Sequence, residues 1–136
     1  MSDWNDLSLH IGAHYREVKR EAHWIGIELP IEAGGVRIKI ERVTAFEESW
    51  VLVIAAICSE THVDAMAALR YNALVAVGSL VLENERCYLR AALPLDGLTK
   101  SALERTIDFI ARESLKLRRQ FSPRGEVPEF LSMFGE

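Results

Sequence analysis

Hydrophobic residues near the start of the chain recur at three- and four-residue steps. The apolar positions are Trp4, Leu7, Ile11, Tyr15, Val18 and Ala22, and charged residues mostly fill the spaces between the later ones. This spacing is typical of an amphipathic helix with one apolar stripe. Ser2 or Asp3 is a suitable N-cap. We therefore predict a first helix that ends before Gly26, where the pattern changes.

Alternation with a period of two takes over in the next part of the chain. Residues 25–32 can form a short first strand, which Pro30 limits to an edge or to a broken ladder. In residues 36–41 apolar and charged side chains alternate, as in a strand with one buried face. Residues 50–58 are apolar at odd and even positions alike, which predicts a central strand covered on both faces. Residues 80–82 and 86–93 form a predicted hairpin with Asn84-Glu85 at its tip.

Two further helices are predicted after the central strand. Residues 61–77 follow a possible Thr61 cap, stop at Gly78, and are apolar nearly all round with many alanines. Such a helix must be covered on more than one side, and a second subunit can pack against one of these sides. The last helix runs from Thr99 to about residue 121 and has a clear apolar stripe.

The predicted order is α-β-β-β-α-β-β-α. Short connections favour an antiparallel sheet of about five strands packed against long helices, an α+β fold. We assign residues 1–121 to one domain and residues 122–136 to a C-terminal tail. The tail carries several apolar residues, which we expect to dock on the domain or on a neighbouring subunit; they are Val127, Phe130, Leu131, Met133 and Phe134.

Composition narrows the functional classes. The chain has 136 residues, 49% of them hydrophobic, with a net charge of -4 and a pI of about 5.6, which predicts a folded domain with no general attraction to nucleic acid. The basic residues that close the last helix suit the helix dipole; they are Lys116, Arg118, Arg119 and Arg124. No signal-peptide pattern or membrane-length apolar run is evident, so we expect a cytoplasmic protein without membrane contact.

The element order resembles that of the type III secretion chaperone-like superfamily, which includes the YbjN-type proteins. The similarity rests on Tyr88-Leu89, on Leu93-Pro94-Leu95, and on the helix over residues 101–117. The resemblance implies a homodimer without enzymatic activity, and we expect no cofactor. It also implies a surface that captures a segment of a partner protein.

Candidate interaction residues follow from this resemblance and from the apolar pattern. We assign the dimer interface to the alanine-rich helix, at Met66, Ala68, Leu69, Ala73 and Ala76. We assign partner binding to the first helix and the central strand, at Trp4, Leu7, Ile11, Val51 and Val53.

The alternative is a small hydrolase or a metal-binding protein. His10 and His14 have the i, i+4 spacing that can present two imidazoles to one metal, but the glutamate of an HExxH motif is missing. Cys58 and His62 are also four residues apart, across a predicted strand-to-helix turn, and can be read as a thiolate–imidazole pair. No orienting carboxylate accompanies that pair, so surface histidines and a buried structural thiol are the simpler interpretation.

Overall fold

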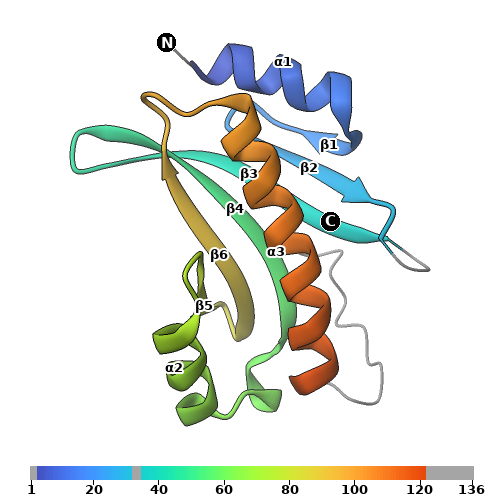
Figure 1. The fold of residues 1–136 in the computed structure, drawn as a ribbon, viewed down its shortest axis with the longest axis vertical. Coiled ribbons are helices and arrows are strands. Elements are labelled where there is room, and N and C mark those ends of the chain that lie inside the picture. The colour runs from blue at the N-terminus through green and yellow to red at the C-terminus, as the bar shows by residue number, and fades with distance from the viewer. Residues whose placement is uncertain (1–2, 32–34, 122–136) are drawn as a thin grey trace.

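The computed structural model describes residues 3–31 and 35–121, which form an antiparallel sheet with two helices against one face and a third beside its edge (Figure 1). The α+β class predicted from the sequence is confirmed. The elements in chain order are α1 (Trp4–His14), β1 (Arg16–Arg20), β2 (Trp24–Leu29), β3 (Val36–Ala45), β4 (Glu48–Ser59), the 3-10 turn η1 (Glu60–His62), α2 (Ala65–Leu74), β5 (Ser79–Glu83), β6 (Arg86–Pro94) and α3 (Lys100–Phe121).

The first helix is shorter than its apolar stripe predicted. Asp3 caps α1 by accepting a hydrogen bond from the Asp6 backbone, and the chain becomes extended at Tyr15. The next residues form β1, which adds a sixth strand to the expected five. The sequence prediction failed here because Val18 fits a helical stripe and a strand equally well.

The sheet has the order β1-β2-β3-β4-β6-β5, with every neighbouring pair antiparallel. Two-residue turns close both β3–β4 and β5–β6. Their central residues, Phe46-Glu47 and Asn84-Glu85, all have positive φ, as type I′ hairpin turns require. The hairpin predicted at Asn84-Glu85 is confirmed.

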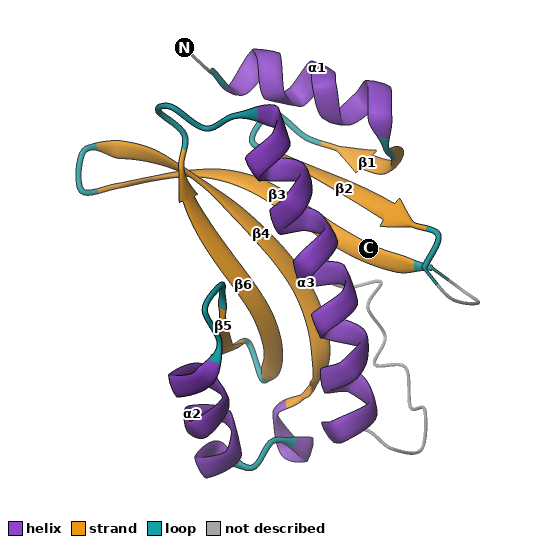
Figure 2. Ribbon diagram, in the orientation of Figure 1, coloured by secondary structure: helices purple, strands orange, loops and turns teal. Residues whose placement is uncertain are grey.

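Helices α1 and α3 lie across the same face of the sheet (Figure 2), and their apolar stripes share one core with it. Residues 36–40 alternate as predicted, with Val36, Ile38 and Ile40 pointing into this core. From α3 the buried stripe is Leu103, Thr106, Ile107, Ile110, Ala111, Ser114, Leu117 and Phe121. The long final helix predicted from the sequence is therefore present, and Thr99 caps its first turn.

Arg118 ties the end of α3 to an irregularity in β4. The β4–β6 register shifts between Ala56 and Cys58, and the Arg118 guanidinium donates two hydrogen bonds, of 3.0 and 2.9 Å, to the Ala56 carbonyl oxygen. Burial lowers the pKa of Arg118 to about 10. This side chain, predicted as part of a basic surface cluster, instead satisfies a backbone acceptor beside the bulge.

Helix α2 begins at Ala65 with Asp64 as its N-cap, because Thr61 lies in η1. It stands beside β5 at the edge of the sheet (Figure 1). The Asn72 amide donates to the Leu80 carbonyl oxygen and accepts from the Leu80 backbone N–H. These bonds satisfy backbone groups on the outer edge of β5 and fix α2 there.

The predicted domain of residues 1–121 remains a prediction, as does the docking of the tail. Residues 122–136 lie outside the described residues.

Candidate protein-binding surfaces

Helix α2 exposes large apolar side chains, and none of its residues is buried in the single chain. Leu69 is 62% exposed and Leu74 is 86% exposed, and Met66 is also exposed. Leu82 on the neighbouring strand β5 is exposed as well. We call Met66, Leu69, Leu74 and Leu82 the α2–β5 face. Among the residues predicted for the dimer interface, Ala68 is half-buried and Ala73 and Ala76 are exposed with Met66 and Leu69.

A second surface lies on the side of the sheet opposite α1 and α3. It contains a groove of about 360 Å³ with a mixed apolar and charged lining; the residues are Lys39, Glu41, Val43, Leu52, Ile54, Val81, Glu83, Asn84, Tyr88 and Arg90. We call it the sheet groove. The expectation that both faces of the central strand are covered is corrected here, because Leu52 and Ile54 are only half-buried.

The strand register sets the charges of the sheet groove. Ile54 lies directly between Lys39 of β3 and Arg90 of β6, and Leu52 lies next to Glu41. Lys39 also stands over the Trp24 ring, 5.0 Å from its centroid, and its ammonium is 3.9 Å from the Glu41 carboxylate. The groove therefore offers apolar contacts on its floor with charges of both signs beside them.

Four of the five residues assigned to partner binding are fully buried in the core. Leu7 and Ile11 lie on the buried side of α1, while Val51 and Val53 lie on the helix-covered face of β4. They have no surface in the single chain, so a partner can reach them only if a helix moves. Trp4 is half-buried, and its indole N–H donates to the Ala22 carbonyl oxygen at 3.1 Å.

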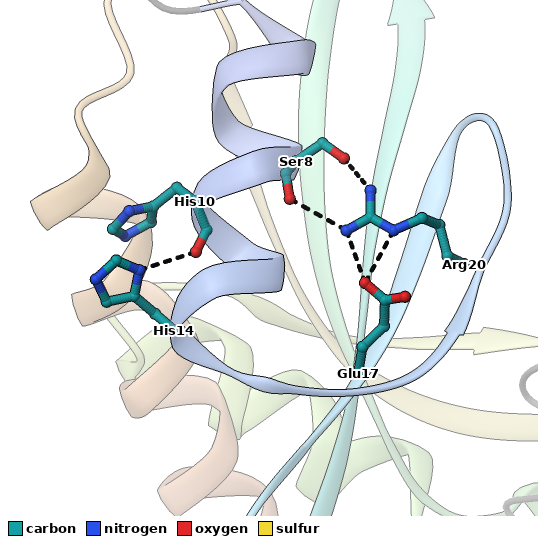
Figure 3. Close-up of polar contacts among 5 residues, drawn as sticks. All are labelled: Ser8, His10, His14, Glu17 and Arg20. Carbon is teal, nitrogen blue, oxygen red and sulfur yellow. Dashed lines mark hydrogen bonds and ion pairs between the residues drawn. The ribbon is translucent and has the colours of Figure 1, made fainter.

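His10 links α1 to α3, and His14 makes a hydrogen bond within α1. The His10 Nε2 atom is 2.7 Å from a Glu104 carboxylate oxygen on α3, and His14 Nδ1 donates to the His10 carbonyl oxygen (Figure 3). Within residues 3–31 and 35–121, no three His, Cys, Asp or Glu side chains come together as metal ligands.

On the other side of α1, Arg20 bonds to Ser8 and Glu17 and joins α1 to β1 (Figure 3). Its Nη2 atom lies 2.7 Å from Glu17 Oε1, and its Nη1 atom contacts the Ser8 hydroxyl. A Cβ atom at Gly12 would lie 3.0 Å from the Arg20 Nη2 atom, so the glycine leaves room for this contact. These contacts are structural in character.

Cys58 has a partner that the sequence did not suggest. It lies opposite Cys87 in the β4–β6 register, and both thiols are buried, whereas His62 is exposed on η1. A hydrogen bond from Cys87 lowers the pKa of Cys58, while the same contact and burial raise the pKa of Cys87. The thiolate–imidazole interpretation is therefore replaced by a two-cysteine contact. Recognition of this pair required the strand register.

The Tyr71 hydroxyl on α2 is buried and finds no hydrogen-bond partner among the described residues. Burial, and secondly the Glu113 carboxylate, raise the pKa of Tyr71 to about 12. A buried hydroxyl without a partner costs free energy on folding.

Tyr71→Phe should leave the free energy of unfolding at pH 7 unchanged, or raise it by up to about 1 kcal/mol, because it removes this hydroxyl. The folded protein also holds the Tyr71 proton more tightly than the unfolded chain does. Stability should therefore fall as pH rises from about 10 towards 12, and the variant should lose less. Urea unfolding at pH 7 and pH 11 measures both effects; a clear loss at pH 7 would show that the hydroxyl is satisfied.

Comparison with known proteins identifies the type of fold. No model of a protein family matches the sequence, and no curated protein sequence matches it. Solved structures do match. The chain is similar to SchA in the HopA1–SchA chaperone–effector complex, with a TM-score of 0.60 and 13% identity over 84% of this chain and 88% of that one. This chain has a type III secretion chaperone-like fold.

Two further solved structures have the same chaperone-like fold. The Yersinia pestis type III secretion chaperone SycH, in complex with a stable fragment of YscM2, gives a TM-score of 0.56 and 11% identity. SpcU from the ExoU–SpcU complex of Pseudomonas aeruginosa gives 0.58 and 16%. Each alignment covers 83% of this chain and 94% of the other. The predicted resemblance to this superfamily is confirmed at the level of fold.

None of the helices in the described part of the chain has both the length and the apolar character needed to cross a bilayer.

Proposed function

We propose that this protein is a non-enzymatic, homodimeric chaperone-like protein that binds a segment of a partner protein. The observation that carries the proposal is the apolar surface left uncovered on the α2–β5 face, together with the mixed apolar and charged lining of the sheet groove. Exposed apolar patches of this kind mark interaction sites in soluble proteins. The fold supports the same class, because the three similar structures are all complexes with another protein.

We assign different roles to the two surfaces. The α2–β5 face is a projecting helix with small and apolar residues, and we propose that it packs against a second copy of the chain. The sheet groove is a shallow channel with half-buried Leu52 and Ile54 in its lining. We propose that it takes an extended partner segment whose apolar side chains pack on Leu52 and Ile54, with charged neighbours contacting Lys39 and Arg90.

The alternative, a hydrolase or a metal protein, is not favoured. Cys58 is buried against Cys87, and His10 contacts Glu104. In the described part of the chain, these contacts take up the residues that the alternative would use as a nucleophile or as metal ligands.

The first step of the test is to obtain a partner segment. The full chain is used to capture partners from native lysate, and limited proteolysis of each complex followed by mass spectrometry identifies the protected peptide. That peptide is synthesised and its affinity for the purified protein is measured by calorimetry.

Ile54→Asp should then weaken peptide binding by about tenfold or more, because burial of such a side chain is worth roughly 1.5 to 3 kcal/mol and 1.4 kcal/mol is a factor of ten. The neighbouring Lys39 and Arg90 should tolerate the new carboxylate in the folded protein. The matched control is Phe46→Asp, at a 93% exposed position on the β3–β4 turn. Equal affinities for wild type and Ile54→Asp would exclude the sheet groove as the binding site.

A further inference from the structure

The two cysteines of the chain lie in positions suited to a disulfide. Cys58 and Cys87 face each other across neighbouring antiparallel strands. Residues directly opposite in such a ladder have Cβ atoms about 4.5 to 5.5 Å apart, and a disulfide brings them to about 3.5 to 4.5 Å. The register shift between Ala56 and Cys58 lies beside the pair. Backbone at a bulge is not locked into a regular ladder, so it can accommodate this small approach.

The surroundings of the pair make one sulfur the better nucleophile. Cys87 donates its thiol hydrogen to Cys58, and this contact lowers the pKa of Cys58 while raising that of Cys87. The thiolate is the form of cysteine that reacts with peroxides, and an adjacent second thiol resolves the oxidised product. Both thiols are buried in the closed fold, so a peroxide reaches Cys58 when the end of β4 opens locally. Cys58 also follows the register shift and lies one residue before the end of β4, whereas Cys87 is paired with Leu82 of β5 on its other side. We therefore assign the attack to Cys58 and the resolving step to Cys87.

We propose that Cys58 and Cys87 are a redox-active pair that closes into an intramolecular disulfide when a hydroperoxide oxidises the protein. With hydrogen peroxide, the Cys58 thiolate attacks one oxygen; an S–O bond forms, the O–O bond breaks, and the departing hydroxide takes a proton to become water. The Cys87 sulfur then loses its proton and attacks the Cys58 sulfur. The S–S bond forms as the S–O bond breaks, and a second water leaves. The two sulfurs together lose two electrons, which reduce the peroxide.

The location of the disulfide gives it a structural consequence. The segment between the two cysteines contains η1, α2 and β5, which together carry the whole α2–β5 face. Oxidation ties the two ends of this segment together, so its local opening becomes harder in the oxidised protein. Amide exchange in α2 and β5 should slow, and the melting temperature should rise by roughly 5 to 15 °C.

The main experiment uses the reduced full-length chain. Hydrogen peroxide is added, the protein is denatured and alkylated, and the mass is measured. Most of the protein should lose both alkylatable thiols, a digest should contain one peptide pair linked through Cys58 and Cys87, and dithiothreitol should restore both thiols. Two thiols that persist after peroxide, separate sulfinic acids, or a link between two chains would each overturn the proposal.

Serine variants test the order of the reaction. Cys87→Ser should accumulate a sulfenic acid at Cys58 that dimedone labels, while Cys58→Ser should label at Cys87 at least about tenfold less. Equal labelling, or the reverse order, would overturn the assigned roles. Circular dichroism checks that each variant folds. If a variant does not fold, the measurement on the wild-type chain still decides whether the disulfide forms.

Discussion

Leu69→Asp should convert the proposed dimer into a monomer. Leu69 is 62% exposed on α2 and belongs to the α2–β5 face that we propose as the subunit contact. A carboxylate buried at a symmetric interface would face an apolar surface and lie near its own symmetry mate. Loss of two leucine contacts per dimer and burial of two unpaired charges would cost several kcal/mol, and each 1.4 kcal/mol weakens association about tenfold.

Sedimentation equilibrium at micromolar concentration measures this change. The matched control is Leu9→Asp, because Leu9 is a leucine on the surface of α1 that is 74% exposed and lies outside the proposed interface. The control should remain a dimer with the wild-type association constant. A wild-type protein that is monomeric at these concentrations would disprove the proposed interface, and so would a Leu69→Asp protein that stays dimeric.

Ile107→Ala should lower the free energy of unfolding by about 2 to 5 kcal/mol, the range for large-to-small substitutions in a packed core. Ile107 lies on the buried stripe of α3 and has no exposed surface. The helix packs chiefly on β4, so a cavity at this position removes contacts between the helix layer and the centre of the sheet. The loss of stability is smaller within this range if the surrounding side chains relax to fill the cavity.

Arg105→Ala is the control on the exposed side of the same helix. Alanine and arginine both favour helix, so this change should alter stability by less than about 0.5 kcal/mol. Urea denaturation followed by circular dichroism compares the two variants. A loss below 1 kcal/mol for Ile107→Ala would mean that α3 is not packed on the sheet as described.

Elements with one strong local period could be predicted from the sequence. The alternation at Val36, Ile38 and Ile40 matches the side-chain period of a strand, and the stripe of α3 matches that of a helix. The Asn84-Glu85 turn was predictable because two strand patterns flank a two-residue connection. These features led to the α+β class, since element order and short connections leave few topologies. The chaperone-like fold was expected from the resemblance to a known superfamily.

Other features depended on contacts between distant residues. Val18 suits a helix or a strand, and pairing of β1 with β2 decided between them. Apolar pattern alone shows that Leu7, Ile11, Val51 and Val53 prefer a nonpolar environment, but not whether that environment is the core or a partner. The structure places all four in the core.

The sequence by itself determined the class, the order of every element except β1 and the positions that avoid water, because local periodicity and turn chemistry encode them. The tertiary structure alone decided which apolar surfaces remain uncovered, on α2–β5 and around Ile54. It also brought Cys58 opposite Cys87. Register and layer packing join residues far apart in the chain, so these contacts depend on the assembled fold and have no signature in any short stretch of sequence.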